Sequence, residues 1–311
     1  MYVYGPVPSR RLGRSLGVSP IVSKTCSYSC VYCQLGRTRN PKTQRTSAFA
    51  KEDILSQIVG LSEVTKPDYI TFCGDGEPTL CKDLGWLIQE TKAILPIPVA
   101  VITNGSLMYR KDVRQDLCRA DVVIPSLDAG DEKTFWKINR PHPSLDYTRI
   151  VQGLVDFRRE FKGQLWLEIM LVRDLNDREE PFGNIKDLLK KINPDRVYLL
   201  TPIRPPAESW VKSPEPSRIL EIMNEIEDAV PLTNREKGSI DLQGFTNART
   251  AIVEIGSRHP LRLEQAKEIE VHFGAPGTIL EMLEVGDLAQ VEYYKQYYLL
   301  PSHLINGKFN N

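Results

Sequence analysis

Residues 15–34, SLGVSPIVSKTCSYSCVYCQ, join a short apolar run with the composition of a β-strand to a loop that carries three cysteines. Cys26, Cys30 and Cys33 have a C-x3-C-x2-C spacing, whereas the other three cysteines of the chain are scattered. So short a spacing can bring three thiolates to one centre, as metal or iron–sulfur ligation requires. The stretch therefore predicts a strand that leads into a metal-binding loop.

The number of nearby ligands bears on the kind of metal centre. A closed structural zinc site needs a fourth Cys or His at a paired spacing. The four histidines, His142, His259, His272 and His303, all lie far along the chain. Three protein ligands leave one coordination position open, which indicates a reactive centre. A zinc site that recruits a distant ligand and a chance grouping of idle cysteines are the alternatives.

Outward from this loop, short apolar runs alternate with segments of helical periodicity. The predicted strands are 15–22, 68–73, 99–103, 121–126, 165–172 and 196–201. The predicted helices are 51–64, 82–94, 109–118, 145–161, 179–192 and 214–229. Nearly continuous apolar strands between helices predict an α/β fold with a parallel sheet covered by helices. Six such units favour an open, partial (β/α)6 TIM-like barrel over a closed eightfold one.

The pattern changes after about residue 235. Three short helical stretches are predicted at 250–257, 262–272 and 277–285, and one or two strands at 289–300. Helices followed by a β-ribbon favour a small winged-helix-like domain. We therefore expect a partial-barrel domain over 1–235 and a winged-helix-like C-terminal domain over 236–311.

Composition excludes several classes of protein. Apolar residues at 41% and charged residues at 26% are typical of a soluble globular chain with a sizeable core. No apolar run approaches the roughly 20 residues of a membrane span, which argues against a membrane protein. The N-terminus lacks the apolar region of a secretory signal, so a cytoplasmic protein is expected.

The charge balance hides an asymmetry. The chain has 40 Lys+Arg and 40 Asp+Glu, but residues 1–50 hold eight basic residues and no acidic one. These are Arg10, Arg11, Arg14, Lys24, Arg37, Arg39, Lys42 and Arg45. Residues 51–311 therefore carry the compensating net −8. Such a segment favours either a polyanion-binding face or local compensation of an acidic centre.

Taken together, two motifs resemble those of the radical S-adenosylmethionine (SAM) superfamily. They are the C-x3-C-x2-C loop, with Tyr32 before its last cysteine, and GDGEPTL (74–80) at the end of a predicted strand. The segments 5–20, 126–145 and 201–211 are similar to a subgroup of stand-alone iron–sulfur oxidoreductases related to wyosine tRNA-modification enzymes. The resemblance covers roughly residues 2–230.

The resemblance implies an oxygen-sensitive enzyme with two cofactors. The three cysteines would hold three irons of a [4Fe–4S] cluster, and SAM would chelate the fourth. An electron from a flavodoxin- or ferredoxin-type donor would cleave SAM to methionine and a 5′-deoxyadenosyl radical, which abstracts hydrogen from the substrate. The hard chemistry would belong to the cofactors, and the protein would bind and aim them. No catalytic acid or base is needed to generate the radical.

The resemblance also implies SAM contacts at the strand ends. The expected contacts are Tyr32 at adenine, Gly74, Asp75, Gly76 and Glu77 at the methionine end, and Asn104, Ser126 and Asp128 at the ribose and carboxylate. Asp75 stands where the superfamily commonly has glycine, so the loop is expected to differ in shape. Taken alone, GDGEP would also suit a plain turn. A cap or turn role is the alternative for Asn104, Ser126 and Asp128, and a packing role is the alternative for Tyr32.

The sequence leaves the substrate open among three hypotheses. A radical SAM enzyme acting on an RNA or tRNA base is favoured by the basic N-terminus, although residues 246–311 hold six basic and eight acidic residues, which suits phosphate binding poorly. The alternatives are an activase or modifier of a protein or peptide, and a non-catalytic iron–sulfur or zinc protein. Arg140, His142, Arg204 and Glu208 are further candidates for substrate contact.

Overall fold

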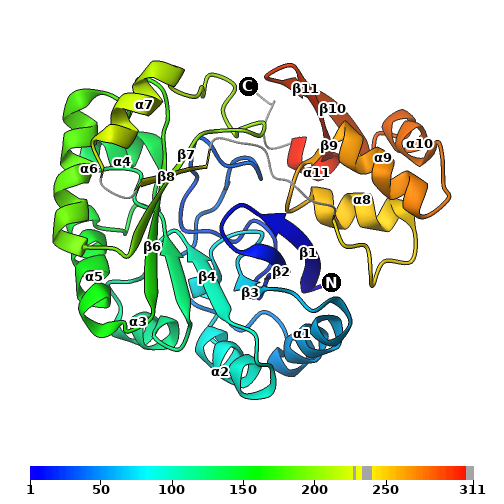
Figure 1. Ribbon diagram of the computed structural model, residues 1–311, viewed down its shortest axis with the longest axis horizontal. Helices are drawn as coiled ribbons and strands as arrows, with labels where there is room; N and C mark the ends of the chain where they lie inside the picture. The colour runs from blue at the N-terminus through cyan, green and yellow to red at the C-terminus, as the bar shows by residue number, and fades with distance from the viewer. Residues whose placement is uncertain (227–228, 233–239, 306–311) are drawn as a thin grey trace.

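The structure, a computed structural model, describes residues 1–226, 229–232 and 240–305. Its centre is an eight-stranded sheet in which the strands follow one another in chain order (Figure 1). The strands are β1 (Val3–Ser9), β2 (Gly13–Val18), β3 (Tyr69–Phe72), β4 (Val99–Thr103), β5 (Val122–Pro125), β6 (Gln164–Met170), β7 (Arg196–Leu200) and β8 (Ala229–Leu232). β1 pairs antiparallel with β2, and every later pairing from β2 to β8 is parallel.

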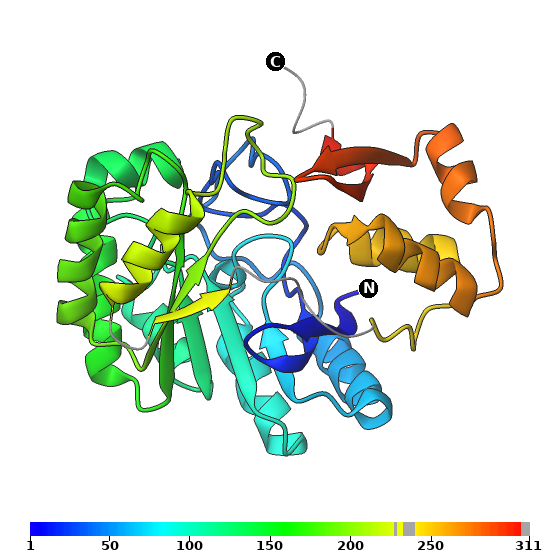
Figure 2. The same ribbon diagram turned by 45° about the horizontal axis from the view of Figure 1, so that its top comes forward.

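Helices cover the outer face of this curved sheet (Figures 1 and 2). They are α1 (Lys51–Thr65), α2 (Leu84–Ile94), α3 (Lys111–Leu117), α4 (Glu132–Ile138), α5 (Tyr147–Glu160), α6 (Glu179–Ile192) and α7 (Pro216–Asn224), with the 3-10 turn η1 (Pro78–Leu80) after β3. The predicted mixed α/β partial barrel is confirmed.

Two strands of the eight-stranded sheet, β1 and β8, were not predicted from the sequence. All six predicted strands are present, but β8 adds a seventh parallel strand and β1 an antiparallel edge. Both were missed because they contain prolines, Pro6 and Pro8 in β1 and Pro231 in β8, which argue against a central strand. Both lie at an edge of the sheet, where a missing backbone donor is tolerated.

Helix α5 shows how the outer layer is fixed. Its stripe of Ile150, Leu154 and Phe157 is buried against the sheet, as the apolar spacing predicts. The Asp146 side chain caps the first turn by accepting a hydrogen bond from the Arg149 amide at 2.8 Å. Burying one such large side chain stabilises the fold by about 1.5–3 kcal/mol.

The C-terminal part of the chain has its own hydrophobic core. Its elements are α8 (Ala248–Gly256), β9 (Leu261–Arg262), α9 (Leu263–His272), α10 (Thr278–Glu284), β10 (Leu288–Tyr293), β11 (Gln296–Pro301) and α11 (Ser302–Ile305). The strands form an antiparallel sheet in the order β10-β11-β9. Its core spans residues 242–299, separate from the main core at 3–222. We call residues 240–305 the C-terminal unit.

The predicted helices and strands of this unit are all present, and the two-residue β9 and the short α11 are additions. The winged-helix-like assignment and the division into 1–235 and 236–311 stay predictions, because the proposed boundary lies outside the described residues. In the part of the chain that is described, no helix combines the length and apolar character that crossing a membrane demands.

Candidate functional site

A cavity of about 390 Å³ opens where the parallel strands end. The carboxyl ends of parallel strands meet at one edge of a sheet, so loops far apart in sequence converge there. The predicted site residues that line it are Cys26, Cys30, Tyr32, Cys33, Gly74, Asp75, Gly76, Glu77, Asn104 and Ser126. Asp128 is the one predicted site residue that does not line this cavity.

The cysteine loop is held in place by backbone hydrogen bonds. The Val31 amide donates to the Ile138 carbonyl at 2.9 Å, and the Ser29 amide donates to the Asn139 carbonyl at 3.0 Å. These bonds fasten the loop to the C-terminal end of α4. The Lys42 amide also donates to the Cys26 carbonyl at 2.8 Å, which closes the loop on itself.

Two asparagine amides reach the cysteine sulfurs. The Asn104 Nδ2 donates to the Cys26 Sγ and the Asn139 Nδ2 to the Cys30 Sγ, both at 3.5 Å. Burial raises the pKa of Cys26 to about 12, with a further rise from the nearby Glu77. Burial also raises the pKa of Cys30. A metal cation bound beside Cys26 and Cys30 would favour their thiolate forms.

The donor set, three thiols at one cavity, is of the type that an iron–sulfur cluster takes. In residues 1–226, 229–232 and 240–305, no group of three or more His, Cys, Asp or Glu is arranged to hold one metal ion. Cys26, Cys30 and Cys33 nevertheless all face one cavity. A zinc ion needs its ligands about 2.3 Å from one point, whereas each thiolate of a [4Fe–4S] cluster meets a different iron. The three cysteines fit the cluster.

The loop after β3 contains glycines at positions where its backbone lies very close to neighbouring segments. A Cβ added to Gly76 would lie 1.9 Å from the Thr25 carbonyl oxygen, beside the cysteine loop. Gly74 has a φ of +144°, and a Cβ there would lie 2.6 Å from the Ser19 Oγ. Neither position accepts a side chain without a backbone shift. The glycines thus let this loop pack directly against β2 and the cysteine loop.

Glu77 joins the loops after β3 and β4. Its Oε1 accepts hydrogen bonds from the Thr79 and Thr103 hydroxyls, each at 2.6 Å, and its Oε2 accepts from the Asn104 amide at 2.7 Å. Burial raises the pKa of Glu77, and these hydrogen bonds oppose that rise. Its carboxylate therefore organises the rim of the cavity, including the residue that contacts Cys26.

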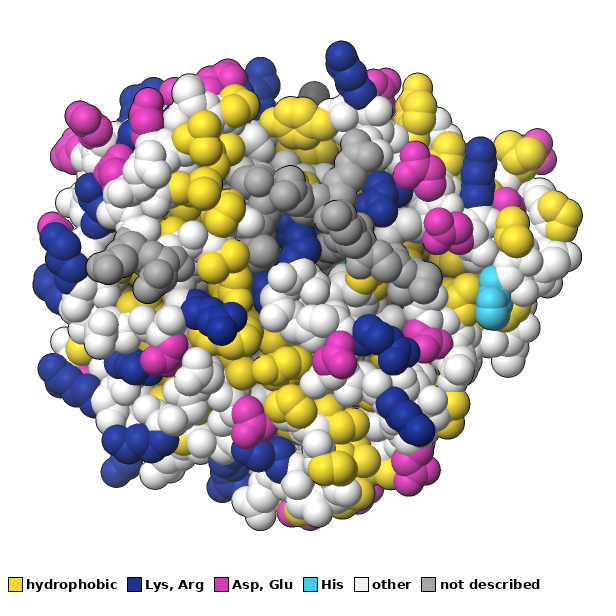
Figure 3. Space-filling view, in the orientation of Figure 1, with side chains coloured by type: hydrophobic (Ala, Val, Ile, Leu, Met, Phe, Trp, Pro, Cys, Tyr) yellow, Lys and Arg dark blue, Asp and Glu magenta, His cyan; other side chains and the backbone are white. Residues whose placement is uncertain are grey.

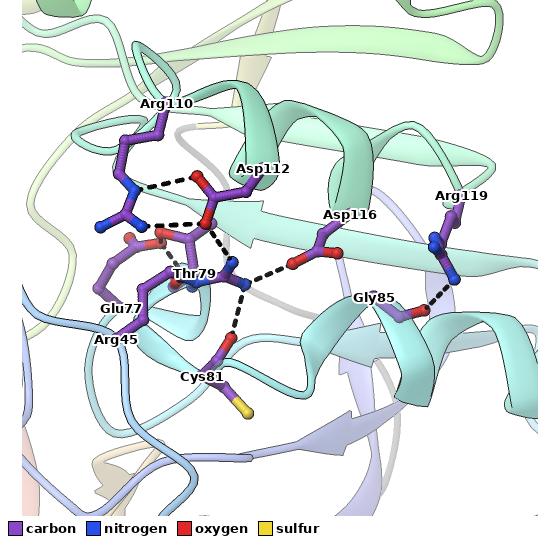
Figure 4. Close-up of polar contacts among 9 residues, drawn as sticks. All are labelled: Arg45, Glu77, Thr79, Cys81, Gly85, Arg110, Asp112, Asp116 and Arg119. Carbon is purple, nitrogen blue, oxygen red and sulfur yellow. Dashed lines mark hydrogen bonds and ion pairs between the residues drawn. The ribbon is translucent and has the colours of Figure 1, made fainter.

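A buried arginine, Arg45, holds the segment that follows Glu77 in the chain (Figure 4). The Arg45 guanidinium donates to the carbonyls of Thr79 at 2.9 Å and Cys81 at 2.8 Å. It also pairs with the carboxylates of Asp112, at 3.0 Å, and Asp116. One charge of the basic N-terminal segment is thus neutralised inside the fold.

Other charges of that segment are also paired. Arg11 pairs with Glu168, Arg14 with Asp241 and Arg37 with Glu208. On the face shown in Figure 3, basic and acidic side chains are interspersed. Local compensation therefore accounts for four of the eight N-terminal charges, although Arg10, Arg11 and Lys24 do line the cavity.

Asp128 lies behind the cysteine loop. Its Oδ2 accepts hydrogen bonds from the Tyr32 hydroxyl at 2.5 Å and the Asn139 Nδ2 at 2.7 Å, and its Oδ1 accepts from the Met170 amide at 2.9 Å. The same Asn139 amide contacts Cys30. Asp128 and the Tyr32 hydroxyl thus help to hold the cysteine loop in place. Ser126, by contrast, lines the cavity.

Some site residues were not anticipated. Asn139 lies in the quoted segment 126–145, but nothing local marks its contact with Cys30. Arg258 and His259 reach the cavity from the C-terminal unit, and no sequence pattern connects them with it. Of the candidates for substrate contact, Arg204 lines the cavity.

The other candidates for substrate contact have different surroundings. Glu208 pairs with Arg37 and Arg140, at 2.8 and 2.5 Å. His142 does not line the cavity and contacts the Ser144 hydroxyl.

Comparison with known proteins gives a consistent result. Residues 21–183 match the family model of the Radical SAM superfamily. A UPF0026 protein of Methanocaldococcus jannaschii is 40% identical over 299 residues, which cover 93% of this chain and 92% of that protein. A protein named GTPase Obg from Brachyspira hyodysenteriae is 50% identical over 203 residues, or 65% of this chain; the match spans only 30% of that longer protein.

Solved structures share the fold at low sequence identity. The crystal structure of Streptococcus suis SuiB bound to S-adenosylmethionine superposes with a TM-score of 0.51 at 16% identity, over 72% of this chain and 50% of that one. At this identity the likeness concerns the fold alone.

Proposed function

The chain belongs to the radical SAM superfamily and to the family of UPF0026 proteins, and on this premise we propose that Cys26, Cys30 and Cys33 hold its [4Fe–4S] cluster. It is an enzyme of a superfamily whose members use a [4Fe–4S] cluster and SAM. The observation that carries the proposal is the single cavity lined by all three cysteines and by the loop of Gly74–Glu77.

When bound, the reduced cluster would supply the electron that cleaves SAM into methionine and the 5′-deoxyadenosyl group, the source of the radical that takes hydrogen from the substrate. The chain's own residues bind and orient these groups. Gly74 and Gly76 expose backbone to the methionine end of SAM, and Asn104 and Ser126 offer polar groups to its ribose and carboxylate. Asp128 enters the proposal as a residue that positions Tyr32 and Asn139.

Apolar side chains complete the cavity. Leu35, Ile102, Met170 and Leu200 line it together with the polar residues. Walls of this kind exclude water, and exclusion of water suppresses side reactions of a reactive intermediate. We propose that a low-potential donor of the flavodoxin or ferredoxin type supplies the electron and that the reaction takes place in the cytoplasm.

The test is formation of 5′-deoxyadenosine by the anaerobically reconstituted, dithionite-reduced protein. We expect product from the wild type and none from Cys30→Ala, because one cluster ligand is lost. Cys118→Ala is the matched control, since Cys118 is exposed at the end of α3. An intact, reduced cluster that yields no product would refute the proposed chemistry, and an active Cys30→Ala would refute the ligand assignment.

We propose an RNA or tRNA base as the substrate class. The support is electrostatic: Arg10, Lys24 and Arg204 line the cavity in addition to the Arg11–Glu168 pair, and basic side chains attract a polyanion. Mass spectrometry of nucleosides and of the proteome, in cells with and without the gene, tests this choice. Loss of a modified nucleoside would support it, and loss of a modified peptide would show that the enzyme acts on a protein.

A further inference from the structure

Asp75 is the residue that departs from the glycine pattern of the loop after β3, and it has a specific partner. Its side chain is buried, and its Oδ1 lies 3.3 Å from the Arg258 Nε. Arg258 belongs to the C-terminal unit, directly after α8, and its side chain is 9% exposed. The pair thus joins the C-terminal unit to the loop proposed to receive SAM.

Arg258 is itself held by further contacts, one of them from its Nη1 to the Glu254 carbonyl at 2.9 Å. Its Nη1 pairs with the Glu254 carboxylate at 2.6 Å, and its Nη2 donates to the Met1 carbonyl at 2.9 Å. The guanidinium also lies over the ring of Tyr4, 5.1 Å from the centroid. The Tyr4 hydroxyl contacts the Sγ of Cys73, which immediately precedes Gly74. Arg258 therefore meets the loop both directly and through β1.

The placement of α8 makes this contact possible. In Figure 1 the C-terminal unit lies beside β1, with α8 nearest to it, and α8 packs against β1. Arg258 and His259 consequently form part of the cavity wall. The unit is a wall of the proposed SAM site.

The positive charge of Arg258 stabilises the buried Asp75 carboxylate. Burial raises the pKa of Asp75, and among the charges around it Arg258 opposes that rise most strongly. A buried carboxylate that loses its cation must take up a proton or move toward water. Either response alters a loop whose glycine backbone has almost no clearance from its neighbours.

We infer that the Asp75–Arg258 pair is a positioning device, through which the C-terminal unit holds the loop of Gly74–Glu77 in the shape that binds the methionine end of SAM. The inference rests on the proposed function. It assigns Asp75 a role in place of the glycine common in the superfamily, and it makes the SAM site depend on the C-terminal unit.

The test is the dissociation constant for SAM, measured by anaerobic equilibrium dialysis with the cluster-loaded full chain. We expect Arg258→Met to weaken binding about tenfold, a size typical of coupled charged pairs. Arg258→Met combined with Asp75→Asn should recover most of the affinity, because the buried charge is removed along with its partner. Arg258→Lys should retain part of it.

Arg249→Met is the matched control. Arg249 lies on α8, and its partners Glu281 and Asp287 belong to the C-terminal unit itself. Hydrogen–deuterium exchange of residues 73–77 without SAM should be faster in Arg258→Met than in the control. Circular dichroism and the cluster spectrum check that each variant is folded and loaded.

The outcomes separate this inference from the proposed function. If Arg258→Met binds SAM and exchanges amide hydrogens at residues 73–77 as the wild type does, the inference is overturned but the proposed function is not. Equal weakness of the single and double variants would also overturn it, since a merely structural loss is not relieved by removing the carboxylate. A loaded wild type that binds no SAM would overturn both the inference and the proposed function.

Discussion

Asn139 connects a buried carboxylate to a cysteine sulfur with one amide group. Its Nδ2 lies 2.7 Å from the Asp128 Oδ2 and 3.5 Å from the Cys30 Sγ. Asn104 makes the corresponding contact with Cys26. Hydrogen bonds to the ligand sulfurs of an iron–sulfur cluster are one determinant of its reduction potential. We therefore expect the side-chain amides of Asn104 and Asn139 to influence the reduction potential of the proposed cluster.

Replacing Asn139 by Ala should lower the midpoint potential of that cluster, because a donor that stabilises the more negative, reduced form is lost. The shift should reach at most about 60 mV, which corresponds to one charge-assisted hydrogen bond of about 1.5 kcal/mol in a one-electron couple. An EPR-monitored redox titration measures it. Asn224→Ala, at the exposed end of α7, is the control. A wild-type potential in Asn139→Ala would contradict the assignment.

At the scale of elements, Glu208 ties three loops together. It follows β7 and accepts two hydrogen bonds at 2.8 Å from Arg37, which follows the cysteine loop, and one at 2.5 Å from Arg140, which follows α4. Its amide also donates to the Val31 carbonyl at 3.1 Å. The cysteine loop contains little regular structure, so contacts of this kind fix its position.

Glu208→Gln should reduce the free energy of unfolding at pH 7 by about 1–2 kcal/mol, since both arginines are partly exposed. Hydrogen bonding from Arg37 holds the pKa of Glu208 below its usual value. The carboxylate therefore contributes stability above the unfolded-state pKa of about 4.3, and this contribution is lost as the pH falls through the lowered value.

Denaturant titrations of the cluster-free protein across this pH range test the prediction. The gap between the wild type and Glu208→Gln should shrink at acid pH. The control is Glu264→Gln, at an exposed side chain 3.9 Å from Arg262, for which we expect almost no difference. A gap that stays constant with pH would show that the Glu208 charge is not the cause.

At the scale of the whole molecule, two cores meet through a polar seam. The Tyr298 hydroxyl donates to the Ile203 carbonyl at 2.7 Å and the Tyr293 hydroxyl to the Pro202 carbonyl at 3.1 Å, so the β10–β11 hairpin is fastened to the segment that follows β7. Figure 2 shows this hairpin reaching toward the barrel. Together with the Asp75–Arg258 pair, these bonds attach the C-terminal unit on two sides of the cavity.

Tyr298→Phe should destabilise the protein by about 0.5–1.5 kcal/mol, because the hydrogen bond to the Ile203 carbonyl is lost without a change in side-chain volume. Chemical unfolding followed by tyrosine fluorescence measures the effect. Tyr297→Phe is the neighbouring control, since Tyr297 is 47% exposed. Equal stability of Tyr298→Phe and the wild type would argue against this seam.

Much of the site could be predicted because its determinants are local. Cys26, Cys30 and Cys33 are close in sequence, and Glu77 and Asn104 lie in the loops after two apolar strands whose ends must meet in a parallel sheet. The two edge strands β1 and β8 could not be predicted, because they contain prolines. Proline disfavours a β-strand except at the edge of a sheet, where its missing N–H is tolerated. Knowing which strands lie at the edge requires the assembled sheet.

The amino-acid sequence by itself determined the alternation of strands and helices and the cysteine spacing, since both are set by periodicity and short-range geometry. Only the tertiary structure decided that Asp128 accepts hydrogen bonds from Tyr32 and Asn139, and that Arg258 pairs with Asp75 across the boundary of two cores. The physical reason is that a buried polar group needs a partner at hydrogen-bond or ion-pair distance. Which distant residue supplies that partner depends on how the cores dock, and no local pattern encodes it.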